Sequence, residues 1–392
     1  MAATFTLGRI AGIRIGVNWT VLAIFLLITF GLAGQVLPDA HPGEPALAYW
    51  VAGLLAALVF FASLLAHELA HATLARRNGI EVEGITLWLF GGVARIQGEA
   101  PDPAAEFRIA GVGPLVSLVL GFVFGVAAWL LGATGAHPLV VESAGWLSGI
   151  NVLLAVFNAI PAAPLDGGRL LRSFLWWRTG DRLSSTIRAS QAGRVFGWLL
   201  VVLGLLGFLS GGTGFGGLWM ALIGWFLVSA ATAEGQQAVV RDALAEIPVA
   251  DVMTADPVTA PAQATVADFL DGDLFRRRHS GFPLVDDSGR PVGLVTLNRI
   301  KQVPQTDRGS TTLGSIACPL DEIAVVRPGE PVADLLPRLA TCSDGRALVL
   351  DGDRVVGIVS PSDVSRTLEW ISVSSGSSRR PPTGRPYPTR GA

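Results

Sequence analysis

The chain has 392 residues, of which 51% are hydrophobic and only 15% are charged, and its mean hydropathy is +0.51. Because a soluble domain carries about a quarter charged residues, this composition excludes an ordinary soluble protein and indicates a membrane protein within a lipid bilayer. The length permits two or three domains, and the formal net charge of −2 gives no reason to expect a nucleic-acid partner.

Apolar segments long enough to cross a bilayer follow one another from the N-terminus, each with about the 20 residues that spanning requires. There are six, at residues 15–34, 48–71, 109–133, 139–162, 194–210 and 213–234. The first is longer than the apolar core of a signal peptide and lacks a clear cleavage site, so we expect it to remain as an anchor. The sequence therefore predicts a multi-pass α-helical membrane protein with six transmembrane helices.

Arginines alternate along the connections between these segments. The N-terminal residues and every second connection carry them, whereas residues 35–47, 132–138 and 210–215 contain none. Cytoplasmic loops are enriched in Lys and Arg. We therefore expect a cell-membrane protein with both termini in the cytoplasm.

The connection between the second and third segments includes residues 81–98, EVEGITLWLFGGVARIQG. This stretch is too short and too interrupted by glycine to span, and its β-branched and aromatic residues favour a hairpin or sheet at the membrane edge. A simple loop is the alternative.

His67, Glu68 and His71 end the second apolar segment as H-E-x-x-H. An ionisable group at membrane depth costs roughly 2.5–3.5 kcal/mol, so three together indicate a site. On a helix this spacing places both imidazoles one turn apart on one face, as tetrahedral zinc requires, and leaves Glu68 free as a base. Taken alone, the five-residue pattern also fits chance or a polar helix end.

A catalytic zinc takes three protein ligands and keeps one position for water, so one more ligand is needed. The second and fourth segments both run from outside to inside, and their C-terminal ends meet at the cytoplasmic side. Asp166 lies there, whereas Glu142 opens the fourth segment at the opposite face, about 30 Å away. Asp166 is therefore preferred among the acidic candidates, which are Glu81, Glu83, Glu99, Asp102, Glu106, Glu142 and Asp166.

Asp166 lies in the stretch FNAIPAAPLDGGRLL, which also carries Asn158. Its prolines and glycines predict a broken helix next to the metal. Non-helical backbone at this depth is tolerated only inside protein or around a water-filled cavity, which hydrolysis needs. The alternatives are a plain helix stop at the interface and, for Asn158, a helix–helix hydrogen bond.

The paired motifs His67–His71 and Asn158–Arg169, in this order, resemble those of the site-2 proteases, which are intramembrane zinc metalloproteases. Residues 111–117, GVGPLVS, are similar to a further segment of that family, although Ser117 stands where Asn is usual. The resemblance covers about residues 8–235.

The resemblance implies peptide-bond hydrolysis with one zinc ion on His67, His71 and Asp166 and with Glu68 as the catalytic base. It allows Asn158 to hold the substrate or the oxyanion. It also implies single-pass transmembrane proteins as substrates, in regulated intramembrane proteolysis. Zinc itself rests on the ligand types and the family, because other divalent ions accept two imidazoles and a carboxylate.

After about residue 240 the composition becomes that of a soluble α/β domain, and residues 249–300 are echoed by residues 313–364. Each copy predicts a strand, an amphipathic helix, two strands joined by a tight turn, and a helix. The repeat resembles a pair of CBS modules. The expected domains are the protease at 1–240, CBS modules at 241–308 and 309–371, and a disordered tail at 372–392.

CBS modules commonly bind adenine nucleotides through a short stretch whose hydroxyl and carboxylate reach phosphate and ribose. The second copy keeps it as GIVSPSD, with Ser360 and Asp363, whereas the first has Thr296 but Arg299 in place of the acid. We expect one competent nucleotide site at most. A CBS pair used only for homodimerisation is the alternative.

Two further hypotheses belong to other classes of protein. A transporter with CBS regulation predicts ionisable residues near span centres or inverted repeats, and the sequence has neither. A catalytically inactive scaffold is disfavoured by the intact Glu68. Cys318 and Cys342 lack C-x-x-C spacing, so we expect ordinary small residues without disulfide or metal roles.

Overall fold

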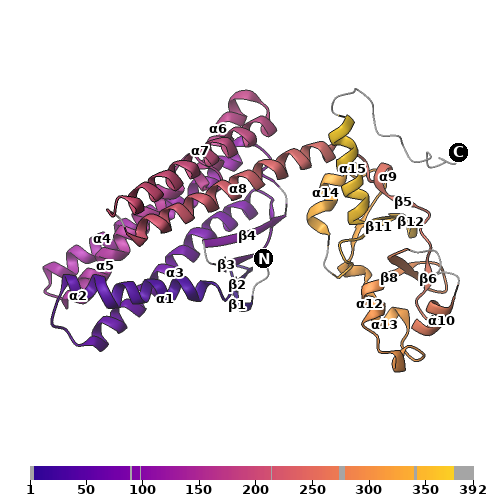
Figure 1. Ribbon diagram of the computed structural model, residues 1–392, viewed down its shortest axis with the longest axis horizontal. Coiled ribbons are helices and arrows are strands. Elements are labelled where there is room, and N and C mark those ends of the chain that lie inside the picture. The colour runs from indigo at the N-terminus through magenta and orange to yellow at the C-terminus, as the bar shows by residue number, and fades with distance from the viewer. Residues whose placement is uncertain are drawn as a thin grey trace. The chain divides into compact units, whose positions relative to one another are not determined.

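The computed structural model describes residues 4–88, 91–97, 99–212, 214–272, 279–339 and 342–374. The chain divides into two compact units, Met1–Ala238 and Val239–Ala392. In Figure 1 the first is a bundle of long helices with a small sheet, and the second combines small sheets with short helices. The predicted fold class is confirmed. Of the predicted disordered tail, residues 372–374 belong to the last helix, and the remainder lies outside the described residues.

Among the described residues, six helical segments are long and apolar enough to cross a membrane. They expose many large apolar side chains, as helices that face lipid do. They are α1 (Val21–Gly31) continued by η1 (Leu32–Val36) and α2 (Leu37–Ala40), then α3 (Ala46–Arg77), α4 (Pro103–Ala133), α5 (Pro138–Asn158), α7 (Arg182–Leu209) and α8 (Phe215–Ala245). The shorter α6 (Asp166–Thr179) lies between α5 and α7 in the sequence.

A four-stranded sheet accompanies the helices, in the order β1-β2-β3-β4. The N-terminal β1 (Phe5–Ile10) and β2 (Ile13–Val17) form one antiparallel pair, and β3 (Glu81–Trp88) and β4 (Gly91–Gln97) form the other. The hairpin expected at residues 81–98 is thus confirmed. The expected start of the first span at residue 15 is wrong, because residues 15–17 pair in parallel with β3 and the helix begins at Val21.

The sheet packs against the part of α3 that carries the H-E-x-x-H motif. Ile13 and Ile15 of β2 and Ile85 and Leu87 of β3 form a buried apolar cluster that includes Ala72 of α3. Since β4 ends the strand order, its outer edge has no strand partner within the described sheet. The polar motif therefore lies beside a sheet edge rather than inside a plain helical bundle.

The predicted helix break is confirmed. α5 ends at Asn158, residues 159–165 follow an irregular path, and α6 begins at Asp166. The irregular segment is fixed to α7, because the Ala163 amide donates to the carbonyl of Ala189 at 3.3 Å. This anchor places the first turn of α6 beside the bundle.

The second unit contains two four-stranded sheets, in the orders β6-β7-β8-β9 and β10-β11-β12-β5. Each repeat contributes its first short strand to the other repeat's sheet, which joins the two modules. The strands are β5 (Thr254–Ala255), β6 (Ala260–Pro261), β7 (Gly281–Val285), β8 (Pro291–Thr296), β9 (Cys318–Pro319), β10 (Ala324–Val326), β11 (Ala347–Asp351) and β12 (Arg354–Val359). The helices are α9 (Val249–Val252), α10 (Val266–Asp271), α12 (Leu297–Lys301), α13 (Leu313–Ile316), α14 (Val332–Leu335) and α15 (Pro361–Ser374). The predicted module boundaries stay predictions.

The expectation that the two cysteines have no disulfide role is wrong. Cys318 and Cys342 form a disulfide, with their Cα atoms 5.6 Å apart, although 24 residues separate them in the sequence. They meet because β9 pairs with β8 of the first repeat, so that Cys318 is buried in an apolar cluster with Leu294 and Leu348. Spacing along the chain gives no sign of this exchange of strands.

Candidate metal centre

Three polar side chains meet where α3 faces the start of α6. Asp166 Oδ2 lies 3.1 Å from both His67 Nε2 and His71 Nε2, and the two nitrogens are 3.1 Å apart. Ligand atoms of a tetrahedral zinc, with bonds of about 2.0–2.1 Å, are roughly 3.3 Å from one another. The three atoms therefore fit one small metal ion.

Both imidazoles are buried, and each is held at its other ring nitrogen by α4. His71 Nδ1 lies 2.6 Å from the carbonyl oxygen of Ile109, which can only accept, so Nδ1 carries the proton and Nε2 presents its lone pair. His67 Nδ1 lies 2.9 Å from the hydroxyl of Ser117. Both rings are thus oriented before any metal arrives.

The Asp166 carboxylate completes the group of ligands. It presents one oxygen to both Nε2 atoms, at 3.1 Å from each, and a carboxylate binds a metal in its ionised form. A cation at this point would therefore satisfy all three groups.

The other acidic candidates have different partners. Asp102 caps α4 by accepting from the Ala105 amide at 2.8 Å, and Glu142 lies 3.6 Å from His41 Nε2. Within the described part of the chain, the groups of three or more potential ligands are His67, His71 and Asp166, and Cys318, Glu322 and Cys342. The disulfide occupies both sulfur atoms of the second group.

A cavity of about 610 Å³ opens onto the metal centre. Its polar wall includes Glu68 and Arg169, and its other walls are largely apolar side chains of α3, α5 and α8. Gly92 of β4 closes it beside Glu68, since a Cβ atom built on Gly92 would lie 2.3 Å from Glu68 Cγ. The Glu68 carboxylate, three metal-ligand candidates and a sheet edge therefore share one cavity.

Asn158 also lines this cavity, but its side chain stays on its own helix. Its Nδ2 donates to the carbonyl of Leu154 at 3.0 Å, so the helix–helix hydrogen bond considered for it is not what the described contacts show. Its role in holding a substrate stays a prediction.

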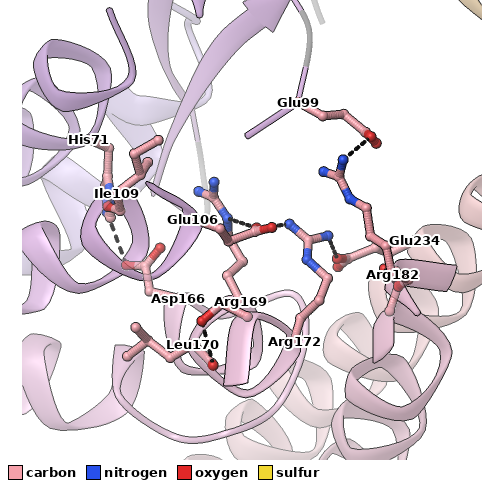
Figure 2. A network of polar contacts seen from close by, with 12 residues as sticks. His71, Glu99, Glu106, Ile109, Asp166, Arg169, Leu170, Arg172, Arg182 and Glu234 are labelled. Carbon is pink, nitrogen blue, oxygen red and sulfur yellow. Dashed lines mark hydrogen bonds and ion pairs between the residues drawn. The ribbon is translucent and has the colours of Figure 1, made fainter. Parts of the chain in front are cut away.

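Charged side chains from several helices surround α6 (Figure 2). Glu106 of α4 contacts Arg172, and Arg172 Nη1 lies 3.4 Å from Glu234 Oε1 of α8. Burial alone would lower the pKa of Arg172, but the charges of Glu106, Glu234 and Glu99 and the hydrogen bond to Glu106 together raise it, so the guanidinium stays charged. In the sequence, Glu106 was a candidate only as a metal ligand. The i, i+3 spacing of Arg169 and Arg172 after Asp166 is the signal that could have suggested a shared face.

The CBS residues form a separate candidate site within the second unit. Ser360 donates to Asp363 through both its amide, at 2.9 Å, and its hydroxyl, at 2.6 Å. The hydroxyl of Thr296 is buried and has no hydrogen-bond partner among the described residues. Arg299, in the first repeat, donates to the carbonyls of Ile316 and Cys342, at 2.8 and 3.1 Å. Both acceptors belong to the second repeat, so Arg299 contributes to the packing between the two modules.

Comparison with known proteins adds to this geometry. Models of two families match the chain: peptidase family M50 at residues 55–140 and 133–203, and the CBS domain at residues 249–304 and 314–369. Over 94% of both chains, the sequence is 46% identical to Rip3 of Mycobacterium tuberculosis, which bears the name of a zinc metalloprotease. The chain belongs to the site-2 protease family, peptidase family M50. This site-2 protease is therefore an intramembrane zinc metalloendopeptidase with a CBS pair, and the predicted enzyme class is confirmed.

More distant relatives cover different shares of the chain. A zinc metalloprotease of Synechocystis, sll0528, is 31% identical over 92% of this chain and 94% of its own. Among solved structures, the site-2 protease from Methanocaldococcus jannaschii is 29% identical, with a TM-score of 0.41 over 59% of this chain and 94% of its own.

Proposed function

We propose that this site-2 protease holds its zinc ion with His67, His71 and Asp166 and hydrolyses peptide bonds in transmembrane segments. The observation that carries the proposal is the triangle of two imidazole nitrogens and one carboxylate oxygen with sides of 3.1 Å. When bound there, zinc supplies Lewis-acid chemistry, which acidifies a water molecule and polarises the scissile carbonyl.

Glu68 acts as the general base in this proposal. It follows His67 in α3, lines the same cavity and is not one of the three ligands. Its carboxylate takes the proton of the attacking water and passes it to the leaving amine. Asn158 lines the same cavity, which supports a contact between its side chain and the substrate peptide.

The substrate must reach Glu68 as an extended peptide, because a helix hides its carbonyls in hydrogen bonds. The outer edge of β4 has no strand partner within the described sheet and lies beside the cavity, so an unwound segment can add to the sheet as a further strand. Single-pass membrane proteins, whose segments can approach through the lipid, are the substrate class that this arrangement suits.

The CBS pair is proposed to regulate this activity by binding an adenine nucleotide at one site. Ser360 and Asp363 supply a hydroxyl and a carboxylate that are already held together. The buried hydroxyl of Thr296, which lacks a partner among the described residues, is a further group that a ligand could satisfy. Arg299 is engaged with backbone carbonyls, which supports a single competent site.

The test is cleavage of a panel of single-pass model substrates by purified protein in detergent, with zinc measured on the same samples. Glu68→Gln is expected to retain zinc and to lose cleavage by several orders of magnitude, because the base is lost while the ligands remain. Cleavage by Glu68→Gln at the wild-type rate would refute the role of Glu68. A wild-type protein that neither cuts nor holds metal would refute the proposed metal site.

A further inference from the structure

A buried group of charged side chains links the helix that carries Asp166 to two neighbouring helices and takes no part in the proposed hydrolysis. Its centre is Glu106, which is fully buried in the first turn of α4. The Glu106 carboxylate contacts Arg172 of α6 and lies 3.6 Å from Arg169 Nε. Arg172 also reaches Glu234 of α8, so three helices meet at one guanidinium (Figure 2).

This group can control where Asp166 lies. Asp166, Arg169 and Arg172 are spaced by three residues, so they lie along one face of α6. α6 has 14 residues and is not among the described helices that are long and apolar enough to span a membrane, so its contacts with α4 and α8 contribute to holding it in place. Because a helix moves as a rigid body, a contact at Arg172 also sets the position of the carboxylate that faces the histidines.

Stability alone is a weak reason for a buried ion pair here. The cost of removing two charges from water commonly cancels their attraction, and apolar residues of similar size often serve as well. Moreover, Glu106 Oε2 and Arg172 Nε have no hydrogen-bond partner among the described residues. An ion pair differs from an apolar contact in fixing direction and length, which is what a metal ligand needs.

Glu234 connects the same group to α8. Ile223, Leu227 and Ala230 of α8 line the cavity, and Glu234 continues their face of the helix. The helix runs on to Ala245, and Leu244 is fully buried in an apolar core of the second unit. A rotation or shift of α8 would therefore change the cavity wall and the contact with Arg172 together.

We propose that Glu106 and Arg172 are positioning residues of the metal centre. They hold α6 so that Asp166 meets the two histidines, and Glu234 makes this position depend on α8. The inference rests on the proposed role of Asp166 as a ligand and deepens it by naming a route of regulation.

The test uses the full-length protein in detergent, freed of zinc and titrated with Co²⁺, whose visible absorption reports the number and arrangement of its ligands. Glu106→Gln is expected to weaken Co²⁺ binding about tenfold or more and to alter the absorption bands. Glu142→Gln is the control, because the Glu142 carboxylate lies 3.6 Å from His41 Nε2, in the first turns of α5 rather than beside α6. It is expected to bind Co²⁺ like the wild type.

A double variant, Glu106→Gln with Arg172→Met, separates positioning from stability. Because it removes both charges of the Glu106–Arg172 pair, its unfolding temperature is expected to return toward the wild-type value while Co²⁺ binding stays weak. A double variant that both folds and binds Co²⁺ like the wild type would overturn the proposal.

Two further variants complete the test. Glu234→Gln is expected to weaken Co²⁺ binding by a smaller factor than Glu106→Gln, and unchanged binding would remove α8 from the proposal. Asp166→Asn serves as the reference for a lost ligand. If it binds Co²⁺ as tightly as the wild type, the ligand assignment itself fails, whatever the charged group does.

Discussion

At Gly113 the backbone of α4 lies directly against the two imidazoles of the metal centre. A Cβ atom built on this glycine would lie 2.1 Å from His71 Nε2 and 2.7 Å from His67 Nε2. Both nitrogens are the ones that face Asp166, so any side chain here would enter the space of the metal ligands. The close approach of α4 also brings Ser117 and the Ile109 carbonyl to the rings.

Gly113→Ala is therefore expected to abolish stoichiometric zinc binding and to lower the free energy of unfolding by about 1–3 kcal/mol through overpacking. Metal analysis and thermal unfolding in detergent measure the two effects. Gly111→Ala is the control on the same helix, because its Cβ would meet only Leu170 Cδ2, at 3.7 Å. Full zinc occupancy in Gly113→Ala would show that the imidazoles are not confined as described.

The pairing of α7 with α8 shows the same dependence on glycine at the scale of whole helices. A Cβ on Gly197 of α7 would lie 2.8 Å from the Gly224 carbonyl oxygen, and one on Gly224 would lie 2.6 Å from the Gly197 carbonyl oxygen. Backbones that approach this closely leave no room for methyl groups, as in other helix pairs within membranes. This contact positions α8, whose Leu227 lines the cavity.

Gly197→Ala is expected to separate the two helices, which lowers the unfolding temperature in detergent and reduces cleavage several-fold through the displaced cavity wall. Gly216→Ala, near the start of α8, has open space around its Cβ and is expected to behave like the wild type. The same unfolding temperature for both variants would argue against tight α7–α8 packing.

Helices and breaks were predicted correctly where the signal lies within the segment itself. The apolar segments and the break between Asn158 and Asp166 were predictable because length, proline and glycine act locally. The strand at Ile13–Val17 was missed because its apolar residues run straight into the first span. Its partner β3 lies more than 60 residues later, so the pairing leaves no local signal.

The metal centre was predictable in part for a geometric reason. His67, His71 and Asp166 could be grouped because the ends of two spans share one side of a membrane, and the structure places them together. Ser117 could not be grouped with them from the sequence, because only the packing of α4 against α3 shows that its hydroxyl contacts His67. The contact between Glu106 and Arg172 likewise depends on how two helices pack.

The disulfide of the second unit is unexpected for the location that the arginine pattern predicts for the whole molecule. The arginine pattern predicts that this unit is cytoplasmic, where thiols are usually kept reduced, yet Cys318 and Cys342 are joined. The bond links β9, which lies in the first repeat's sheet, to the segment before β11 in the other sheet. Both cysteines belong to the second repeat, so the bond ties the strand that this repeat contributes to the first sheet to the rest of the same repeat.

Reduction is expected to lower the free energy of unfolding of the second unit by about 3 kcal/mol, because a loop closed across 24 residues is released. Thermal unfolding with and without a dithiol reductant measures this, and alkylation with mass detection counts the thiols. The chain has only two cysteines, so Cys318→Ser is a clean control that should not respond to reductant. Free thiols in the unreduced wild type would contradict the bond.

The measurement that tests the central claim most directly is zinc X-ray absorption on the purified, full-length protein. With zinc on His67, His71 and Asp166, the nearest neighbours are nitrogen and oxygen at about 2.0–2.1 Å, and Asp166→Asn changes this shell. Sulfur neighbours at about 2.3 Å would contradict the account. They would instead place the metal at the group of Cys318, Glu322 and Cys342.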